Sequence, residues 1–382
     1  MSTDSATPIQ VLRPDGTVNA DHPLAEVASN LSTADHRTMY NDLVVARAFD
    51  NQATALQRQG ELALWAPCLG QEAAQVGSAR ALTSPDWVFP SYREHAVLLA
   101  RGIDPAQILP LFRGASHGGW DVHKYQTYLY TLVVGAQTLL GVGYAQGLAL
   151  DLAAGQSEPA AVIVYLGDGA TAQGDFNESL VFAAATRAPV VFFIQNNGWA
   201  ISTPTAGQSP VPLAQRGAGF GIPSLRVDGN DVLACRAATA QALHQARTGQ
   251  GPQLVEAVTY RIGAHTTADD PGRYRSKSEE LAWAALDPIE RYQAYLLSRD
   301  LADQAFLDQV EANAQTMASR TRQACRAITP PDLDQLMRQT YATPHGLVDQ
   351  ELAQRQTSRR VASSAQASTH LQAAAPCQAV MA

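Results

Sequence analysis

The chain has 382 residues, of which 46% are hydrophobic, which is enough to bury a large core in one big domain or two ordinary ones. Its formal net charge of −8, without a cluster of basic residues, argues against nucleic-acid binding, and its apolar runs are too short and too interrupted to cross a membrane. The four cysteines are widely spaced and form no metal-binding motif, which predicts a reducing, cytoplasmic environment.

The N-terminal part of the chain predicts an arm followed by helices. Residues 1–30 are polar with scattered Pro and Gly, and we interpret them as an arm that is either loose or laid on a partner. From Thr33 to Gly60, apolar residues recur at steps of three and four, which predicts an amphipathic helix. A second helix is expected to end near Leu82, and a short strand at Val88-Phe89 follows it.

Tyr92 and Arg93 directly follow this short strand and precede another helix. A helix start beside an Arg can clamp a phosphate, but a surface ion pair explains the same residues equally well. Packing alone can explain His95, which lies in the helix. The segment Thr131–Ala149, TLVVGAQTLLGVGYAQGLA, is apolar and rich in small residues, which predicts a buried helix packed closely on another.

The stretch 161–203 has two apolar strand patterns around an amphipathic helical pattern. Asp168 follows the first strand and Asn197 follows the second. Because parallel strands joined by a helix bring their carboxyl ends to one edge, these two side chains are expected to meet. Their oxygens suit Mg²⁺, and Gly167 and Gly169 would let a diphosphate approach the backbone. The alternative is an ordinary turn between a strand and a helix.

His265 lies in the loop Ile262–Arg275, just after the predicted strand Leu254–Arg261. It is therefore expected at the same sheet edge as Asp168 and Asn197. A near-neutral pKa would suit it to proton transfer or to contact with a diphosphate, although a loop histidine can also be simply solvated. We expect the loop to be mobile.

The C-terminal part predicts helices and then a tail. Residues 278–326 follow an amphipathic helical pattern, whereas from residue 351 Ala, Gln, Ser, Thr and Arg dominate without a usable apolar pattern, which predicts disorder. We therefore expect an arm at 1–30, one α/β domain at 31–350 and a disordered tail at 351–382. The domain should contain a mostly parallel sheet flanked by helices, with helical N- and C-terminal extensions.

Several segments, in order along the chain, carry a resemblance to a known family. They read LGQEAAQVGSA (69–79), FPSYREH (89–95), VVGAQ (133–137), YLGDGATAQGDFNE (165–178), VVFFIQNNGWAIST (190–203), RGAGFGIPS (216–224), VDGNDV (227–232) and EAVTYRIGAHTTADDPGRYR (256–275). Together they resemble the alpha subunit of the thiamine-diphosphate-dependent first component of 2-oxo acid dehydrogenase complexes, in its pyruvate and branched-chain versions. The resemblance implies the thiamine-diphosphate-binding fold.

The resemblance also implies roles for individual residues. The Mg²⁺ ligands would be the side chains of Asp168 and Asn197 and the main-chain carbonyl of Trp199. The residues that bind thiamine diphosphate would be Tyr92, Arg93, Leu132, Val134, Gly167, Asp168, Gly169, Ala170, Asn197, Trp199 and His265. His265 would also be catalytic, in passing the acyl group to lipoamide.

Two positions depart from the pattern of some relatives. Gln195 stands where some relatives carry Arg, so one cationic contact to phosphate is absent here. Thr266 stands where some animal relatives carry a regulatory serine, so kinase control of that kind is not expected.

The activity implied by the resemblance is the oxidative decarboxylation of a 2-oxo acid, with transfer of the acyl group to lipoamide on a lipoyl-bearing acyltransferase. The sequence HTTADDPGRYR (265–275) and the run Gln195-Asn196-Asn197 lean towards pyruvate-type enzymes, and the branched-chain acid 3-methyl-2-oxobutanoate and acetoin are alternative substrates. Only one diphosphate-type strand–helix–strand unit is recognisable. The glutamate that this family places at the aminopyrimidine would therefore come from a beta subunit, in an alpha–beta heterotetramer.

Two other classes of function have weaker support. A purely structural subunit would not need Arg93, Asp168, Asn197 and His265 together. A nicotinamide-dependent oxidoreductase is disfavoured, because no GxGxxG motif follows a predicted strand with an acidic residue about 20 positions further on.

Overall fold

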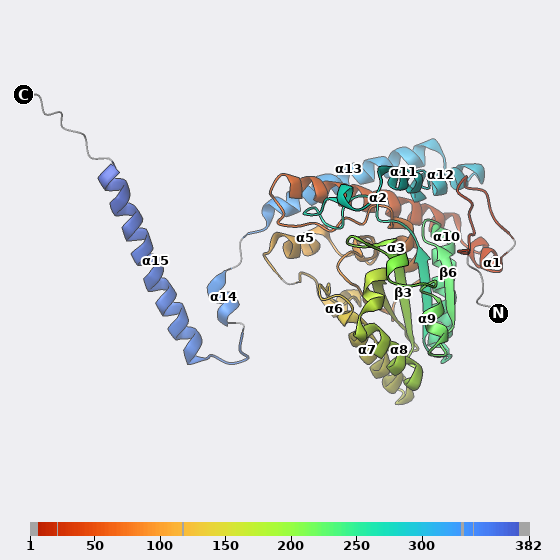
Figure 1. The fold of residues 1–382 in the computed structure, drawn as a ribbon, viewed down its shortest axis with the longest axis horizontal. Helices are drawn as coiled ribbons and strands as arrows, with labels where there is room; N and C mark the ends of the chain where they lie inside the picture. Colours follow the sequence, from red (N-terminus) through yellow and green to blue (C-terminus); the bar gives the residue numbers. More distant parts are fainter. Residues whose placement is uncertain (1–6, 21, 117, 330–331, 339, 374–382) are drawn as a thin grey trace, which may run out of the picture. The chain divides into compact units, whose positions relative to one another are not determined.

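The computed structural model describes the chain except for residues 1–6, 21, 117, 330–331, 339 and 374–382. The chain divides into two compact units, the first ending at Ile328 and the second starting at Thr329. We call the first unit the body. Figure 1 shows its central sheet surrounded by helices.

The body is built on a five-stranded, entirely parallel sheet with the strand order β1-β2-β3-β7-β6. Its strands are β1 Trp87–Phe89, β2 Val162–Gly167, β3 Val190–Asn196, β6 Ser224–Asp228 and β7 Gln253–Val258. A separate antiparallel pair joins β4 Trp199–Ala200 to β5 Thr203–Pro204. The parallel sheet flanked by helices confirms the predicted α/β class. It also places the carboxyl ends of all five strands at one edge.

Helices precede the first strand, and at least one helix separates each strand of the parallel sheet from the next along the chain. The helices of the body are α1 Leu24–Ser29, α2 Thr33–Arg58, α3 Glu72–Ala79, α4 His95–Ala100, α5 Pro105–Arg113, α6 Val122–Tyr125, α7 Ala136–Ala153, α8 Gly174–Thr186, α9 Gln215–Ala218, α10 Val232–Arg247, α11 Lys277–Ala284, α12 Pro288–Ser298 and α13 Gln304–Ala327. Short 3₁₀ turns are η1 Asp168–Ala172, η2 Thr205–Gly207 and η3 Pro271–Arg273.

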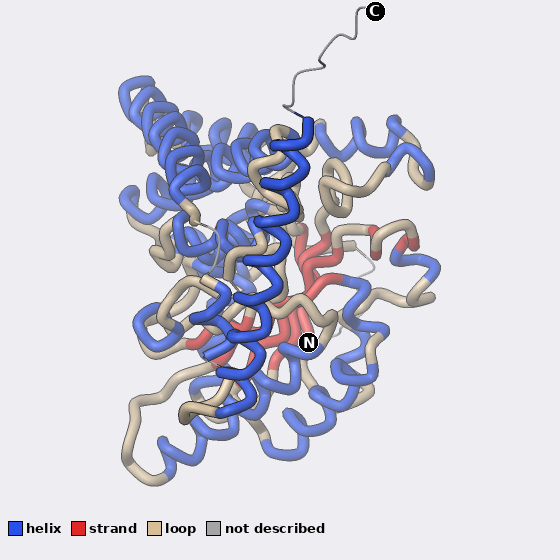
Figure 2. Tube along the Cα trace, turned by 90° about the vertical axis from the view of Figure 1, so that its left-hand side faces the viewer, coloured by secondary structure: helices blue, strands red, loops and turns tan. Residues whose placement is uncertain are grey.

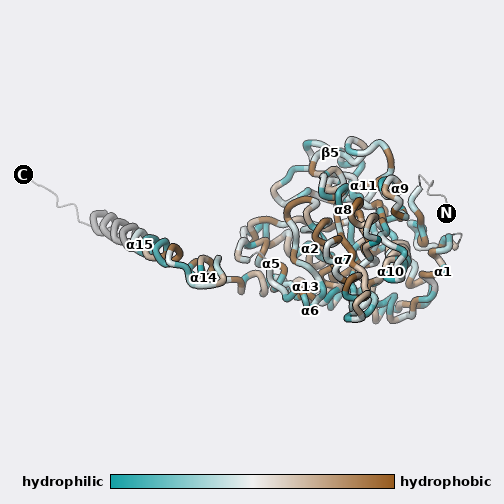
Figure 3. The backbone as a smooth tube through the Cα atoms, turned by 90° about the horizontal axis from the view of Figure 1, so that it is seen from below, coloured by the Kyte–Doolittle hydropathy of each residue, from teal (hydrophilic) through white to brown (hydrophobic). Residues whose placement is uncertain are grey.

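Side chains alternate between two apolar layers along the central strands. Ile163 and Phe193 face the layer that contains α3, α4 and α10, whereas Val164 and Phe192 face α7 and α8. Because both faces of the sheet are covered, β2 and β3 are apolar almost throughout, as expected for buried parallel strands. Figure 2 shows the strands enclosed by helices, and Figure 3 shows that these helices carry both apolar and hydrophilic stretches.

The N-terminal arm lies on its own chain. Ile9 forms a parallel bridge with Val227 of β6, and Leu12 is fully buried. The buried carboxylate of Asp231 accepts hydrogen bonds from the main-chain N–H groups of Val11 and Leu12 at 2.7 and 2.6 Å. The part of the arm that the structure describes therefore extends the sheet edge, which differs from the expected loose or partner-bound arm. Residues 1–6 lie outside the described residues.

The segment Thr131–Ala149 also differs from its prediction as one helix. Helix α7 begins only at Ala136, because Gly135 adopts a left-handed conformation with φ of 92°. Residues 131–135 instead form a loop at the carboxyl ends of the strands. Helix α7 is buried on one side only, since Leu140 and Leu150 are 47% and 71% exposed.

The second unit contains α14 Leu333–Arg338 and α15 Gly346–Ala373. The sequence predicts disorder from residue 351, whereas the structure has a helix over most of that segment. Ala, Gln, Arg and Leu all favour helices, so a segment without an apolar stripe can still be helical. Residues 374–382 of the expected tail lie outside the described residues. Among the described residues, no helix is long and apolar enough to span a bilayer.

Candidate active site

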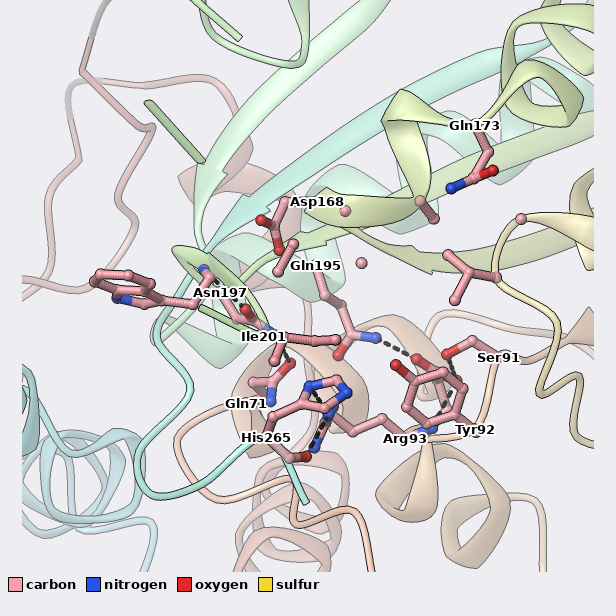
Figure 4. Close-up of a pocket in the computed structure, with 18 of the residues that line it drawn as sticks. Gln71, Ser91, Tyr92, Arg93, Asp168, Gln173, Gln195, Asn197, Ile201 and His265 are labelled. Atoms are coloured by element: carbon pink, nitrogen blue, oxygen red, sulfur yellow. Dashed lines mark hydrogen bonds between the residues drawn. The ribbon is translucent and has the colours of Figure 1, made fainter. Parts of the chain in front are cut away.

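A cavity of about 270 Å³ lies where β1, β2, β3 and β7 end, and we call it the strand-end cavity. Figure 4 shows the labelled side chains pointing into this one space from segments that are far apart in the sequence. Among the residues proposed from the sequence, those that line the cavity are Tyr92, Arg93, Val134, Gly167, Asp168, Gly169, Ala170, Asn197, Trp199 and His265. Leu132 does not line it and is 56% exposed.

Asp168 is a buried carboxylate at the end of β2, where the strand passes into the turn η1. Its Oδ2 accepts hydrogen bonds from Thr205 Oγ1 at 2.9 Å and from Gln208 Nε2 at 3.0 Å. Burial raises the pKa of the Asp168 carboxyl, and these two hydrogen bonds partly offset the rise. Its Oδ1 accepts no hydrogen bond from any other residue that the structure describes. This oxygen can therefore accept a cation without breaking a contact.

Asn197 and Trp199 follow the end of β3 and bring two further oxygens to the cavity. Asn197 Nδ2 donates to Gln71 Oε1 at 3.2 Å, and Asn197 Oδ1 accepts from the Trp199 N–H at 3.3 Å. The Trp199 carbonyl accepts a hydrogen bond from Arg261 Nη1 at 3.0 Å. Each of these oxygens keeps a second lone pair for another ligand.

These groups fit a hard divalent cation. A carboxylate, an amide oxygen and a main-chain carbonyl are oxygen donors of the kind that Mg²⁺ accepts, usually together with phosphate and water oxygens. Within the described residues there is no cluster of three or more His, Cys, Asp or Glu side chains that could hold a metal. A cation here would therefore depend on amide, carbonyl and ligand oxygens as well as on Asp168.

Arg93 and His265 form the opposite wall of the cavity (Figure 4). Arg93 Nη2 donates to the His265 carbonyl at 2.9 Å and contacts His265 Nδ1 at 3.2 Å, and Arg93 Nη1 donates to the Pro67 carbonyl at 2.5 Å. Since a guanidinium only donates, Nδ1 of His265 is the acceptor, and the neutral ring carries its proton on Nε2. This places an N–H donor on the ring atom that Arg93 does not occupy.

The sequence predicts a near-neutral pKa for His265, but the structure gives a lower one. Burial, followed by the positive charges of Arg93 and Arg261, lowers it to about 4, while Asp269 acts in the opposite direction. His265 is therefore a neutral hydrogen-bonding group at pH 7 in the protein without ligands. The sequence could not indicate this lowered pKa. It depends on burial and on Arg93, which follows β1 and is far from His265 in the sequence, as well as on Arg261, which follows β7.

The loop that carries His265 is anchored at several points. The His265 N–H donates to Asp269 Oδ2 at 2.8 Å, and Tyr274 Oη donates to the same oxygen at 2.5 Å. The Thr267 N–H donates to the Trp65 carbonyl at 2.9 Å, and the Trp65 N–H donates to Thr267 Oγ1 at 3.0 Å. These contacts fix the approach of His265 to Arg93, whereas the sequence analysis expected a mobile loop.

Several polar contacts of the cavity and its surroundings could not be predicted from the sequence. Gln195 Nε2 donates to the buried Glu94 Oε1 at 2.6 Å, and Ser91 Oγ donates to Glu94 Oε2 at 2.8 Å. Burial raises the pKa of the Glu94 carboxyl. Gln195, which stands where some relatives carry Arg, therefore hydrogen-bonds a buried carboxyl group here. The Thr205 and Gln208 contacts to Asp168 were also missed, because only the folded loop shows them.

Comparisons with known proteins identify relatives of this chain. Residues 40–330 match the family described as "Dehydrogenase E1 component". The chain is 46% identical over 343 residues to the 3-methyl-2-oxobutanoate dehydrogenase subunit alpha of Mycobacterium tuberculosis (strain CDC 1551 / Oshkosh), which covers 90% of this chain and 91% of the relative.

Two further relatives are alpha subunits of the pyruvate dehydrogenase E1 component. The chain is 43% identical over 263 residues to that of Acholeplasma laidlawii, covering 68% of this chain and 75% of the relative. It is 37% identical over 304 residues to that of Bacillus cereus, covering 79% and 80%. The family match spans most of the chain and the three relatives align over 75–91% of their own length, so the resemblance seen in the sequence is confirmed: the chain belongs to the dehydrogenase E1 component family, among its alpha subunits.

Proposed function

We propose that this chain is the alpha subunit of a 2-oxo acid dehydrogenase and that the strand-end cavity binds Mg²⁺ and the diphosphate of thiamine diphosphate. The observation that carries the proposal is the convergence of Asp168 and Asn197 with Arg93 and His265 around one cavity at the strand ends. Family membership supports the cofactor, and the oxygen donor set supports the cation.

Each wall of the cavity has a separate task in this proposal. Asp168, Asn197 and the Trp199 carbonyl would hold the cation. Arg93, Tyr92 and the N–H of neutral His265 would hold diphosphate oxygens, and Gly169 would let the backbone come close. The chemistry that this cofactor supplies when bound is electron withdrawal from the keto carbon during loss of carbon dioxide. During the reaction the same Nε2–H of His265 would donate a hydrogen bond to an oxygen of the reacting group in place of the diphosphate, without giving up its proton.

We infer that a beta subunit completes the site. The exposed apolar side chains at the cavity rim and on the neighbouring helices support this inference, since such patches mark partner surfaces. Val133 on the rim loop is 71% exposed, Leu140 on α7 is 47% exposed, and Phe182 on α8 is 50% exposed. An alpha–beta heterotetramer would cover them and supply the residues that meet the aminopyrimidine. The acyl group would pass to a lipoyl-bearing acyltransferase.

The substrate proposal has two candidates, each with its own support. The segment 265–275 leans towards pyruvate. The relative with 46% identity is named for 3-methyl-2-oxobutanoate. A one-methylene difference is worth only about 1–3 kcal/mol in a hydrophobic pocket, so a few side chains from either subunit could decide the preference.

The test is an assay of the chain assembled with its beta subunit on pyruvate, 3-methyl-2-oxobutanoate and acetoin, with thiamine diphosphate and Mg²⁺. We expect cofactor-dependent decarboxylation of a 2-oxo acid, with the highest kcat/KM on pyruvate. A higher kcat/KM on 3-methyl-2-oxobutanoate would make the branched-chain acid the preferred substrate and leave the proposed class of enzyme unchanged. Turnover by the chain without any partner would refute the beta-subunit requirement.

The predicted cytoplasmic location stays a proposal. It is supported by the three cysteines that the structure describes, Cys68, Cys235 and Cys325, which are all buried and form no disulfide.

A further inference from the structure

We propose that Thr205 and Gln208 are positioning residues that orient the Asp168 carboxylate and thereby set the affinity of the cation site. This inference rests on the proposed function, because it assigns the Asp168 carboxylate to a bound cation. Neither residue belongs to the ligand set inferred from the sequence, and neither lines the strand-end cavity. They act on the cation only through Asp168.

Both side chains bind the same carboxylate oxygen. Thr205 Oγ1 and Gln208 Nε2 lie 2.9 and 3.0 Å from Asp168 Oδ2. Two donors on Oδ2 fix the rotation of the carboxylate and leave Oδ1 as the oxygen without a donor from another described residue. A buried carboxylate held in one orientation loses little entropy when it binds a metal, whereas a freely rotating one must be ordered first.

Thr205 also links Asp168 to the end of β3. Its Oγ1 lies 3.0 Å from Asn196 Oδ1, the residue before Asn197. Asn196 is itself fixed, because its Nδ2 donates to the buried Glu256 Oε1 at 2.8 Å. The hydroxyl has a single proton and both oxygens are acceptors, so Thr205 shares one donor between Asp168 and Asn196. These two residues lie at the ends of β2 and β3, the two strands that supply the proposed cation ligands.

The loop that carries these residues is otherwise exposed. Ile201, Thr203 and Pro204 are exposed, whereas Thr205 and Gln208 are half-buried and turn towards Asp168. The Thr205 N–H donates to the Gly198 carbonyl at 2.9 Å and closes the loop. The exposed loop is thus joined to the buried carboxylate by these two side chains.

Gly169 allows this close approach. A Cβ added at Gly169 would lie 2.7 Å from the Cβ of Ala200 and 3.8 Å from Oε1 of Gln208. The missing side chain next to Asp168 therefore makes room for the loop as well as for a diphosphate. Packing against Ala200 is thus a second structural requirement for glycine at position 169.

The test is the affinity for Mn²⁺, measured by electron paramagnetic resonance on the full chain assembled with its beta subunit and saturated with thiamine diphosphate. Thr205→Val and Gln208→Met each remove one donor at nearly constant volume. We expect each to raise the Kd for Mn²⁺ by about 10-fold or more, because losing a group that orients a metal ligand costs about 10–100-fold in affinity. At saturating metal, kcat should return close to the wild-type value.

Three controls make the result specific. Thr203→Val changes the same residue type in the same loop, and the Thr203 hydroxyl makes no hydrogen bond to a residue that the structure describes, so its Kd should stay within twofold of wild type. Thr205→Ser keeps the hydroxyl and should keep the affinity. Circular dichroism melting shows whether each variant is folded, and Gln208→Met, in an exposed loop, remains informative if Thr205→Val does not fold.

Two outcomes would overturn the inference. Folded Thr205→Val and Gln208→Met proteins with wild-type Mn²⁺ affinity would remove the positioning role and leave the proposed function intact. A wild-type protein that binds neither Mn²⁺ nor thiamine diphosphate would remove the proposed function, and the inference with it.

Discussion

Asp168 combines a structural cost with the proposed binding role. Its carboxylate is 2% exposed and has no arginine or lysine in hydrogen-bond contact among the described residues. Burial of a charge without a close counter-ion is unfavourable, and a bound divalent cation would reverse this cost. The buried Asp168 charge would therefore destabilise the protein without a cation more than the protein with a cation bound.

Asp168→Asn tests this balance. The amide keeps the shape and can still accept from Thr205 and Gln208, but it removes the buried charge. We expect the cofactor-free variant to melt at a higher temperature than wild type, and to lose the stabilisation that wild type gains from Mg²⁺ with thiamine diphosphate. Differential scanning calorimetry with and without both ligands measures both effects. A variant that melts lower when empty, or that still responds to Mg²⁺, would contradict the assignment.

His265 predicts a pH dependence of stability. Its pKa is about 4 in the folded protein, whereas an unperturbed histidine titrates near 6.5. Between these values the unfolded chain binds more protons than the folded one, so this contribution to stability is present above about pH 6.5 and is lost as the pH falls towards 4. Urea unfolding at pH 7.5, 5.5 and 4.5 should show a larger loss for wild type than for His265→Gln. Parallel pH profiles would show that His265 is not buried as a neutral group.

At this scale, the sequence could predict the residues that follow strand ends. Asp168, Asn197 and His265 could be located because each comes directly after an apolar strand pattern. The contacts of Arg93 with Pro67 and His265, and of Gln208 with Asp168, could not be predicted. These contacts depend on how loops from different parts of the chain pack together at the carboxyl edge of the sheet. Loops have no hydrophobic periodicity from which such packing could be predicted.

Helix α7 shows how single glycines decide packing between elements. Gly141 is buried against the sheet, and a Cβ there would lie 2.3 Å from Cγ2 of Val164. Gly143, two residues on, faces away from the sheet and has no atom within 4 Å of such a Cβ. The small residues of Thr131–Ala149 predict close packing along the helix, and of these two glycines only Gly141 is closely packed within this chain.

The two glycines form a matched pair for mutation. Gly141→Ala should destabilise the chain by about 1–3 kcal/mol through overpacking against Val164. Gly143→Ala should stabilise it by up to about 1 kcal/mol, because alanine favours an exposed helix over glycine. Urea unfolding of the two variants measures the difference. Equal effects of the same sign would mean that α7 does not lie against β2 as described.

The elements themselves were predictable where periodicity is strong, and their ends were not. Helix α2 was expected from Thr33. The structure has Ser32 as the N-cap, and Asp35 completes a reciprocal capping box with it. The helix expected from residue 131 starts later, because the conformation of Gly135 depends on the cavity loop and not on an apolar pattern.

At the scale of the whole molecule, the exposed apolar side chains of α7 and α8 point to an assembled protein. Phe182→Asp should weaken assembly with the beta subunit while leaving the fold of this chain intact, because it introduces a charge into the proposed interface. Sedimentation velocity of the mixed subunits measures the assembly. Leu297→Asp on α12, a 44% exposed apolar position in the other helical layer, is the matched control. Unchanged assembly of the Phe182 variant would place the partner elsewhere.

The fold class could be predicted because alternating strand and helix patterns allow few arrangements, and a parallel sheet brings its strand ends to one edge. The order of the strands and the packing of the N-terminal arm on β6 could not, since both depend on contacts between distant segments. Helix α15 was missed because its composition favours a helix without an apolar stripe that would reveal one.

The central claim is that the strand-end cavity is the Mg²⁺ and diphosphate half of a site that a beta subunit completes. The most direct measurement is the release of carbon dioxide from a 2-oxo acid by the chain assembled with its beta subunit, with and without thiamine diphosphate and Mg²⁺, for wild type and Asp168→Asn. We predict release only by the assembled wild-type protein with both ligands present. Release by Asp168→Asn at the wild-type rate, or by either subunit alone, would contradict the account.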